Sequence, residues 1–122
     1  MKITNIKLLN YVQGLNAFVN KDKAVPFKLS YAINKNLGMF RSALEPFEKT
    51  RNEILSKNLS VEEQNEAFED LCEIEIEIED IYKVPMSLAE GIADLSTKDF
   101  MAIEFMLEDE GLNNATAPVS ED

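Results

Sequence analysis

Histidine is absent from the 122 residues, and the chain holds only one cysteine, Cys72, and four glycines. Histidine is the commonest general base and metal ligand, and a zinc site needs several Cys or His residues. A single cysteine excludes an internal disulfide, and no histidine is present to activate it. No G-x-x-x-x-G-K-S/T or G-x-G-x-x-G sequence is present to bind phosphate. These absences favour a protein without catalytic residues, metal or cofactor.

Long apolar runs are also absent. No run approaches the roughly 18 residues that a membrane span needs. The first segment, MKITNIKLLNYVQGLN, lacks the continuous apolar stretch of a secretory signal. Hydrophobic residues make up 45% of the chain, which is enough for a folded core. We therefore expect one soluble cytoplasmic domain over residues 1–111, followed by a disordered acidic tail at 112–122.

Basic residues are scarce in the second half of the chain. Residues 1–58 carry ten Lys/Arg and four Asp/Glu, whereas residues 59–122 carry two Lys/Arg and nineteen Asp/Glu. The halves therefore have net charges of +6 and −17, within a total of −11. This asymmetry indicates either an acidic interaction surface or internal pairing of oppositely charged faces.

A first helix is predicted over residues 5–20. Gly14 weakens it by about 1 kcal/mol relative to alanine. Pro26 suits the first turn of a second helix, because proline is tolerated where no amide hydrogen is needed. One face of the first helix carries apolar residues spaced 4, 3 and 4 apart. They are Leu8, Val12, Leu15 and Val19.

The strongest periodicity lies between residues 27 and 57. Apolar residues recur there at alternating spacings of 4 and 3, with Arg51 as the one polar position. Pro46 removes a hydrogen bond and clashes with the preceding turn, so we expect a kink or break near residues 42–46. The apolar positions of this seam are Ile33, Leu37, Phe40, Leu44, Phe47 and Ile54.

The seam has two interpretations. It can be the spine of an intramolecular helical hairpin or small bundle packed on the helix at 5–20. We favour this interpretation because helices joined by short loops usually pack as neighbours. It can instead join two copies of the chain in a coiled-coil homodimer.

A short acidic strand is predicted in CEIEIEIEDI, residues 72–81. The strict alternation and the β-branched isoleucines favour a strand, although a helix through the same residues also gives an acceptable apolar spacing. Its partner would be residues 1–4, residues 81–86 or a second subunit. Before it, Ser60 begins an S-x-x-E capping box, which predicts a helix starting near Val61.

A final helix is predicted over residues 97–110. It follows an S-x-x-D sequence at Ser96 and ends before Gly111, a typical C-terminal cap. Its residues are apolar nearly all round, which indicates burial in the core or under a partner. Phe105 and Met106 are the candidate contacts for filling a partner's groove.

The run from 60 to 81 contains ten acids and no base. We favour a solvated strand face whose glutamates block edge-to-edge aggregation. A binding surface that mimics the charge of nucleic acid is an alternative. A calcium site is disfavoured, because no D-x-D/N-x-D/N-G turn is present. The candidate partner-binding acids are Glu73, Glu75, Glu77 and Glu79.

Four segments carry a family resemblance: VPFKLSYAINKN (25–36), FRSALEPFEKTRNEIL (40–55), EIEIEIEDI (73–81) and LSTKDFMAIEFMLED (95–109). Over about residues 1–110 the chain resembles a family of small uncharacterised proteins from phages and prophages of Gram-positive bacteria. Its members share a pattern of the kind LP-x-K-x-S-Y-x-I-x-K-N, a long charged helix, an alternating strand and a closing helix. The resemblance implies a phage gene expressed in the bacterial host cytoplasm, and it assigns no catalytic residue.

Together these patterns predict a predominantly helical α+β protein. It would combine a long kinked central helix in a hairpin or bundle, one short acidic β-strand region and a C-terminal helix. We expect a non-enzymatic phage-type protein that binds a host or phage protein, with inhibition of a host defence system as one purpose. Direct contact with nucleic acid or membrane is not expected. The alternatives are an acidic nucleic-acid mimic, an assembly component oligomerising through residues 33–54, and a small-molecule-binding module.

Overall fold

A computed structural model describes residues 1–20, 24–92 and 94–109 of the chain. These residues form six α-helices and two small two-stranded sheets, so the predominantly helical α+β class is confirmed. The chain divides into two compact units. Unit 1 combines residues 1–13 with 37–80, and unit 2 combines residues 14–36 with those from 81 onward. Whether the units behave as the single domain expected for residues 1–111 stays a prediction.

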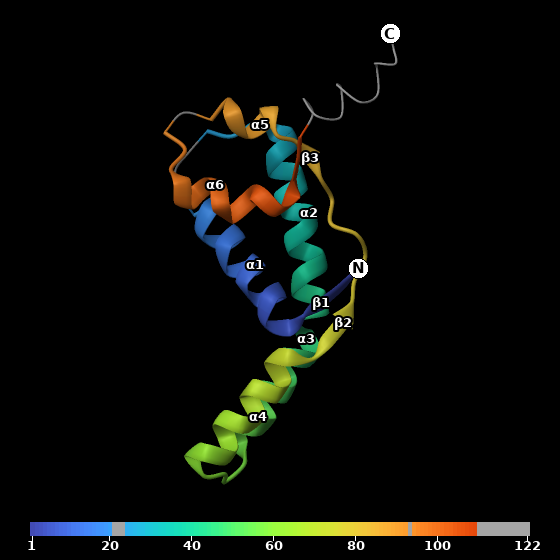
Figure 1. The fold of residues 1–122 in the computed structure, drawn as a ribbon, viewed down its shortest axis with the longest axis vertical. Helices are drawn as coiled ribbons and strands as arrows, with labels where there is room; N and C mark the ends of the chain where they lie inside the picture. The colour runs from blue at the N-terminus through green and yellow to red at the C-terminus, as the bar shows by residue number, and fades with distance from the viewer. Residues whose placement is uncertain (21–23, 93, 110–122) are drawn as a thin grey trace. The chain divides into compact units, whose positions relative to one another are not determined.

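The sheet of unit 1 joins the start of the chain to the acidic stretch. Strand β1 (Lys2–Thr4) pairs antiparallel with β2 (Glu75–Glu77), with Ile3 opposite Ile76 (Figure 1). Residues 1–4 are therefore the strand partner, one of the three candidates considered above. The strand itself is shorter than the alternation predicted.

Helix α1 (Asn5–Val19) follows β1 directly and confirms the helix expected over residues 5–20. Leu8 and Leu15 are fully buried, as the predicted apolar face requires. Val19 is 45% exposed, whereas Phe18 is buried in its place. The inward face therefore shifts by one residue near the end of the helix.

The long central helix breaks where proline predicts. Helix α2 (Phe27–Ala43) is separated from α3 (Glu45–Ser56) by a single residue, and Pro46 occupies the first turn of α3. Leu44 lies between the two helices, and its amide donates to the Phe40 carbonyl at 3.0 Å. Because proline offers no amide hydrogen, it fits a first turn and not the middle of a continuous helix.

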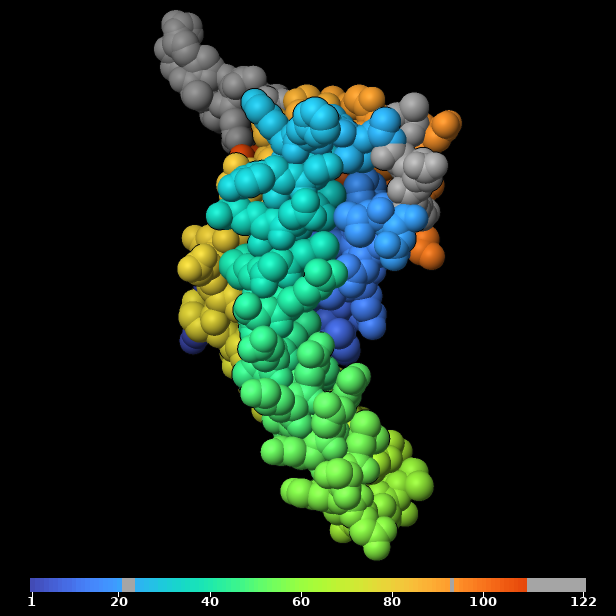
Figure 2. Space-filling view, turned by 180° about the vertical axis from the view of Figure 1, so that it is seen from behind, coloured from blue at the N-terminus to red at the C-terminus, as the bar shows by residue number. Residues whose placement is uncertain are grey.

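Helices α3 and α4 (Val61–Glu73) form a helical hairpin in unit 1. The predicted capping box is present, since Ser60 Oγ accepts from the Glu63 amide and Glu63 Oε1 accepts from the Ser60 amide. Side chains of α3 (green) lie at the surface in Figure 2. Arg51 is exposed, as its polar character requires. The hairpin therefore presents a charged exterior.

All six apolar positions of the predicted seam are buried. Their exposed fractions are at most 8%, with Ile54 at that upper value and Phe40 at zero. Phe40 also lies beside Tyr11, with ring centroids 5.9 Å apart. Because these side chains are covered by the chain itself, the intramolecular interpretation is supported. A homodimer through this seam would need its residues to be uncovered first.

The end of the described chain departs from the predicted helix over 97–110. Helix α6 (Thr97–Ile103) is short and passes into a 3-10 turn, η1 (Glu104–Met106), and a strand, β4 (Leu107–Glu108). Strand β4 pairs in parallel with β3 (Val84–Pro85) in unit 2. Pairing with β3 satisfies the extended backbone that replaces the last helical turn. Gly111 and the tail at 112–122 lie outside the described residues.

Unit 2 contains the end of α1, the first part of α2 and several short elements. Helix α5 (Ser87–Glu90) follows β3, and α6 approaches α1 closely enough that a Cβ on Gly14 would meet Ala102 Cβ at 3.6 Å. Ile33, Ile103 and Met106 are at most 1% exposed. No helix within the described ranges is long and apolar enough to cross a membrane.

Candidate functional site

Helix α4 carries an acidic stripe. Glu62, Glu66, Glu69 and Glu73 are all exposed and follow one another at spacings of 4, 3 and 4. This spacing places them on one face of the helix. Asp70 is also exposed, on the turn between Glu66 and Glu73. Many of the exposed acids of unit 1 thus lie on a helix face, whereas the alternating sequence predicted a strand face.

The strand predicted in residues 72–81 is correct only in its middle. Glu73 ends α4, β2 holds Glu75 and Glu77, and Glu79 follows the strand. All four glutamates are exposed, as expected for candidate partner contacts. Ile74 is 49% exposed because it caps the helix, whereas Ile78 is only 8% exposed. We name Glu62, Glu66, Glu69, Asp70, Glu73, Glu75, Glu77 and Glu79 the acidic surface.

Asn5 holds the junction between α4 and β2 in place. Its side-chain Nδ2 donates to the Leu71 carbonyl at 2.9 Å, and its amide donates to the Ile74 carbonyl at 3.0 Å. The carbonyls at a helix C-terminus have no partner within the helix. The Leu71 carbonyl also accepts from the Ile74 amide at 3.4 Å, so Asn5, which is 4% exposed, adds a second donor at the point where α4 ends and the chain enters the strand.

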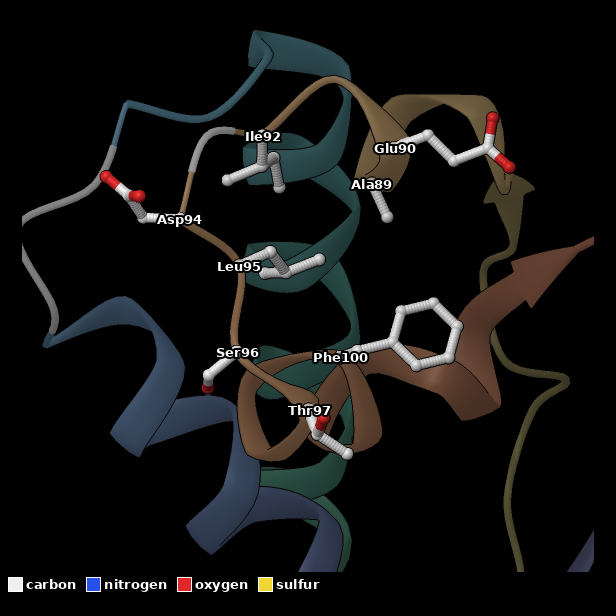
Figure 3. Close-up of a pocket in the computed structure, with 8 residues that line it drawn as sticks. All are labelled: Ala89, Glu90, Ile92, Asp94, Leu95, Ser96, Thr97 and Phe100. Atoms are coloured by element: carbon white, nitrogen blue, oxygen red, sulfur yellow. The ribbon is translucent and has the colours of Figure 1, made fainter.

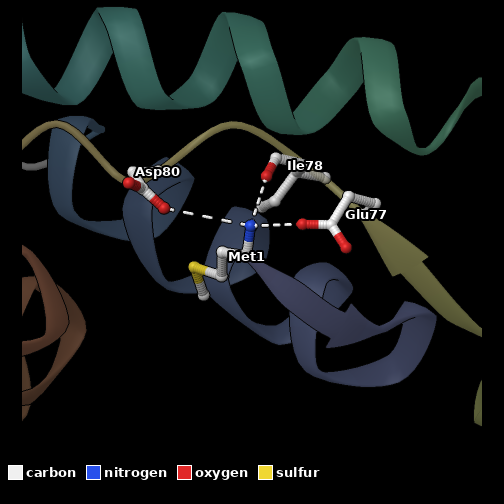
Figure 4. A network of polar contacts seen from close by, with 4 residues as sticks. All are labelled: Met1, Glu77, Ile78 and Asp80. Atoms are coloured by element: carbon white, nitrogen blue, oxygen red, sulfur yellow. Dashed lines mark hydrogen bonds and ion pairs between the residues drawn. The ribbon is translucent and has the colours of Figure 1, made fainter.

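The first residue meets the end of the acidic stretch (Figure 4). The Met1 amino group lies 2.6 Å from Glu77 Oε2 and 3.8 Å from Asp80 Oδ1. It also donates to the Ile78 carbonyl at 2.7 Å. Lys2 stands opposite Glu77 in the strand register. The β2 end of the acidic surface is therefore partly compensated by β1.

Among the residues that the structure describes, the α4 part of the acidic surface has no such compensation. Within residues 1–20, 24–92 and 94–109, no Lys or Arg side chain forms an ion pair with an acid of α4 or β2. The internal pairing considered from the charge asymmetry is therefore not formed here. These carboxylates face solvent, where a positively charged surface can reach them.

The acid distribution on α4 also opposes helix stability. Glu62 and Glu63 suit the positive N-terminal end of the helix dipole, but Asp70 and Glu73 lie in the last turn, where no base is present. The pair formed by Glu69 and Glu73 places like charges at i and i+4, which costs a few tenths of a kcal/mol. Local conflicts of this kind concentrate at functional sites.

Met106 was predicted as a candidate partner contact, but it is not at the surface. Its side chain is fully buried in unit 2, and its Sδ lies 3.6 Å from Asn36 Nδ2. Phe105 is half-buried and already engaged with other residues of the chain. Because α6 ends at Ile103, both residues belong to η1 and do not form an exposed helical face.

Within the described residues, unit 2 holds pockets of about 540 and 420 Å³. The larger, about 540 Å³, is bordered by α5, the following loop and α6, and its Ser96 hydroxyl already accepts from the Asp99 amide. Figure 3 shows Glu90 and Asp94 on opposite sides of it, so their carboxylates do not converge. The smaller, about 420 Å³, is lined by aromatic and lysine side chains. The sequence analysis did not predict this smaller pocket.

No group of three or more His, Cys, Asp or Glu side chains within the described ranges is arranged to hold a metal ion. Cys72 is half-buried at the end of α4.

Comparison of the chain with protein-family models, with curated proteins and with solved structures gives no match.

Proposed function

We propose that this chain is a binding protein without an active site, and that the acidic surface of unit 1 docks on a basic surface of a partner protein. The observation that supports the proposal is the row of exposed α4 carboxylates with no Lys or Arg partner in the described chain. Exposed charges of one sign steer a partner of opposite charge and raise its association rate.

The helical stripe also favours mimicry of nucleic acid as a second candidate. From Glu62 to Glu73 the helix rises about 16 Å, so the four stripe glutamates are spaced about 5 Å apart along the axis. A nucleic-acid strand carries one charge per roughly 3.4 Å of its axis. The stripe is therefore less dense in charge than a strand of DNA but regular enough to occupy a groove that binds phosphates.

An assembly role through residues 33–54 has less support. Its seam is buried by the chain itself, so the seam offers no free apolar face for a second copy. The phage context and the inhibition of a host defence system stay predictions that rest on the family resemblance.

The proposal is tested with two matched charge-reversal variants. The first changes Glu66, Glu69 and Glu73 to lysine, and the second changes Glu90, Glu104 and Glu108 of unit 2 to lysine. All six acids are exposed, and lysine near the end of α4 is favoured by the helix dipole. Circular dichroism should confirm that both variants fold.

Each protein is then used to capture partners from a bacterial lysate at low and high salt, with mass spectrometry as the readout. We expect proteins that are retained by the wild type and the unit 2 variant but lost by the α4 variant and at high salt. Competition by double-stranded DNA for the same captured protein would select the mimic over the general binding protein. Identical capture by all three proteins would contradict both candidates.

A further inference from the structure

A groove in unit 2 gathers exposed aromatic side chains. Phe27 and Tyr31 come from the first turns of α2, and Tyr82 precedes β3 in the chain. Their exposed fractions are 92%, 58% and 40%. Aromatic side chains exposed singly are common, but three that line one groove of about 420 Å³ form an apolar patch typical of an interaction site.

The two tyrosines pack against each other. Their ring centroids are 5.7 Å apart and their planes meet at 77°, an edge-to-face contact. Val84 and Pro85 extend the wall of the groove along β3. The tyrosine pair therefore offers one aromatic surface on which an apolar side chain can pack, as prolines do in the aromatic grooves that bind extended peptides.

The buried side chain of Asn36 holds Tyr82 in place. Asn36 is fully buried, accepts from the Tyr82 amide at 2.8 Å and donates to the Tyr82 carbonyl at 3.0 Å. Both backbone groups of Tyr82 are thus fixed by one side chain of α2. A groove that is held in place before binding loses less conformational freedom when the ligand arrives.

The charged residues that line the groove are positive, although the exposed Glu108 stands opposite Pro85 in the strand register. Lys28 and Lys83 line it, and Lys35 Nζ lies 5.8 Å from the centre of the Tyr82 ring. None of the seven lining residues is acidic, although the whole chain has a net charge of −11. At physiological salt a charge acts over about 8 Å, so the lysines dominate what a ligand meets inside the groove.

We propose that this groove binds an extended segment of a partner protein that places a proline or another apolar side chain on the Tyr31–Tyr82 pair and carboxylates beside Lys28 and Lys83. The groove shares no residue with the acidic surface and its lining has the opposite charge, so the proposal goes beyond the proposed function. A single-stranded nucleic acid would also combine stacking with negative charge. Its affinity, however, depends on neutralising many phosphates, and only two lysines line this groove.

The test uses three fluorescent probes with the full chain, read by anisotropy. The first is a synthetic peptide with two prolines flanked by aspartates and glutamates, the second has lysine in place of each acid, and the third is an oligothymidylate. We expect the acidic peptide to bind at least about tenfold more tightly than either of the others. Tighter binding of the oligothymidylate would overturn the proposal in favour of nucleic acid.

Variants then locate the binding. Phe27→Ala and Tyr31→Ala should each weaken the acidic peptide by about fivefold or more, since exposed aromatic anchors carry much of an interface's affinity. Met101→Ala, a matched change at a residue that is 65% exposed elsewhere in unit 2, should leave the affinity unchanged. Equal losses in all three variants, or no loss in the first two, would overturn the proposal.

Charge reversal provides the complementary result. The double variant Lys28→Glu with Lys83→Glu should bind the acidic peptide more weakly and the lysine-containing peptide more tightly. The reason is that the reversed groove repels carboxylates and attracts lysines. Lys98→Glu is the matched control in unit 2 and should change neither affinity. Failure of the acidic peptide to bind the wild type at about 1 mM would also refute the proposal.

Discussion

Replacement of Asn36 should destabilise the protein far more than an average polar substitution. The side chain is fully buried and makes two hydrogen bonds with the backbone of Tyr82, at 2.8 and 3.0 Å. Each such bond contributes about 1 kcal/mol, and a buried backbone group left without a partner costs about 1–3 kcal/mol. Tyr82 is 40% exposed, so water can compensate part of this loss. We expect Asn36→Ala to lower the free energy of unfolding by about 2–4 kcal/mol.

Asn36→Asp adds a dependence on pH whose sign is fixed by the geometry. An ionised carboxylate accepts from the Tyr82 amide but cannot donate to the Tyr82 carbonyl, and its burial is unfavourable. The folded state therefore binds the proton of this carboxyl more tightly than the unfolded state, where the pKa is about 3.9. The destabilisation should be smallest below about pH 4 and should grow as the pH rises.

The assay is urea unfolding followed by circular dichroism at several pH values between acid and neutral. Asn10→Ala and Asn10→Asp are the controls, because Asn10 is exposed on α1. Both controls should stay within about 0.5 kcal/mol of the wild type. An Asn36→Ala variant as stable as these controls, or an Asn36→Asp variant that gains stability with rising pH, would refute the reasoning.

Three further predictions concern local helix energetics, all measured by urea or thermal unfolding. Gly14→Ala and Gly38→Ala should each stabilise the chain by about 0.5–1 kcal/mol, because the new Cβ meets Ala102 only at ordinary contact distance in the first case and open space in the second. Ser60→Ala should destabilise by about 1 kcal/mol through loss of the α4 capping box. Glu69→Gln with Glu73→Gln should stabilise by about 0.5–1 kcal/mol at low salt, and the gain should shrink at high salt.

Each of these has a contradicting outcome. A destabilising Gly14→Ala would show that the Cβ cannot be accommodated near Ala102. A neutral Ser60→Ala would mean that α4 begins without its cap. A salt-independent effect of the two glutamine substitutions would show that charge is not its source.

Local signals placed most of the helices correctly. The start of α4 follows from Ser60 and Glu63, which lie three residues apart and bond each other directly. The break before α3 follows from Pro46, whose ring and missing amide hydrogen act within one turn. The buried face around Phe40 follows from spacing alone, because covering a helix on one side selects the same periodic positions whatever lies opposite.

The candidate sites were less predictable. The alternating stretch satisfied both a strand and a helix pattern, and the structure uses both, with α4 continuing to Glu73 and β2 starting at Glu75. Contacts distant in sequence act at this change, among them the pairing of β2 with β1 and the bond from Asn5 to the Leu71 carbonyl, 66 residues away in the chain. Glu73, Glu75, Glu77 and Glu79 are exposed, in keeping with the solvated face favoured from the sequence, since a run of acids without bases has little chance of burial. The exposed acids of α4 before Glu73 were not singled out, although their spacings of 4 and 3 follow the helix period.

The sequence by itself determined the charge layout, the helical periodicity, the caps and the proline break, because each depends on residues within a few positions of one another. Only the tertiary structure decided the partner of β2, the end of α6 and the aromatic groove. The groove joins Tyr31 to Tyr82, fifty-one positions apart, through the bonds of Asn36 to the Tyr82 backbone. Contacts of that separation depend on how the whole chain closes, and no local pattern of spacing encodes them.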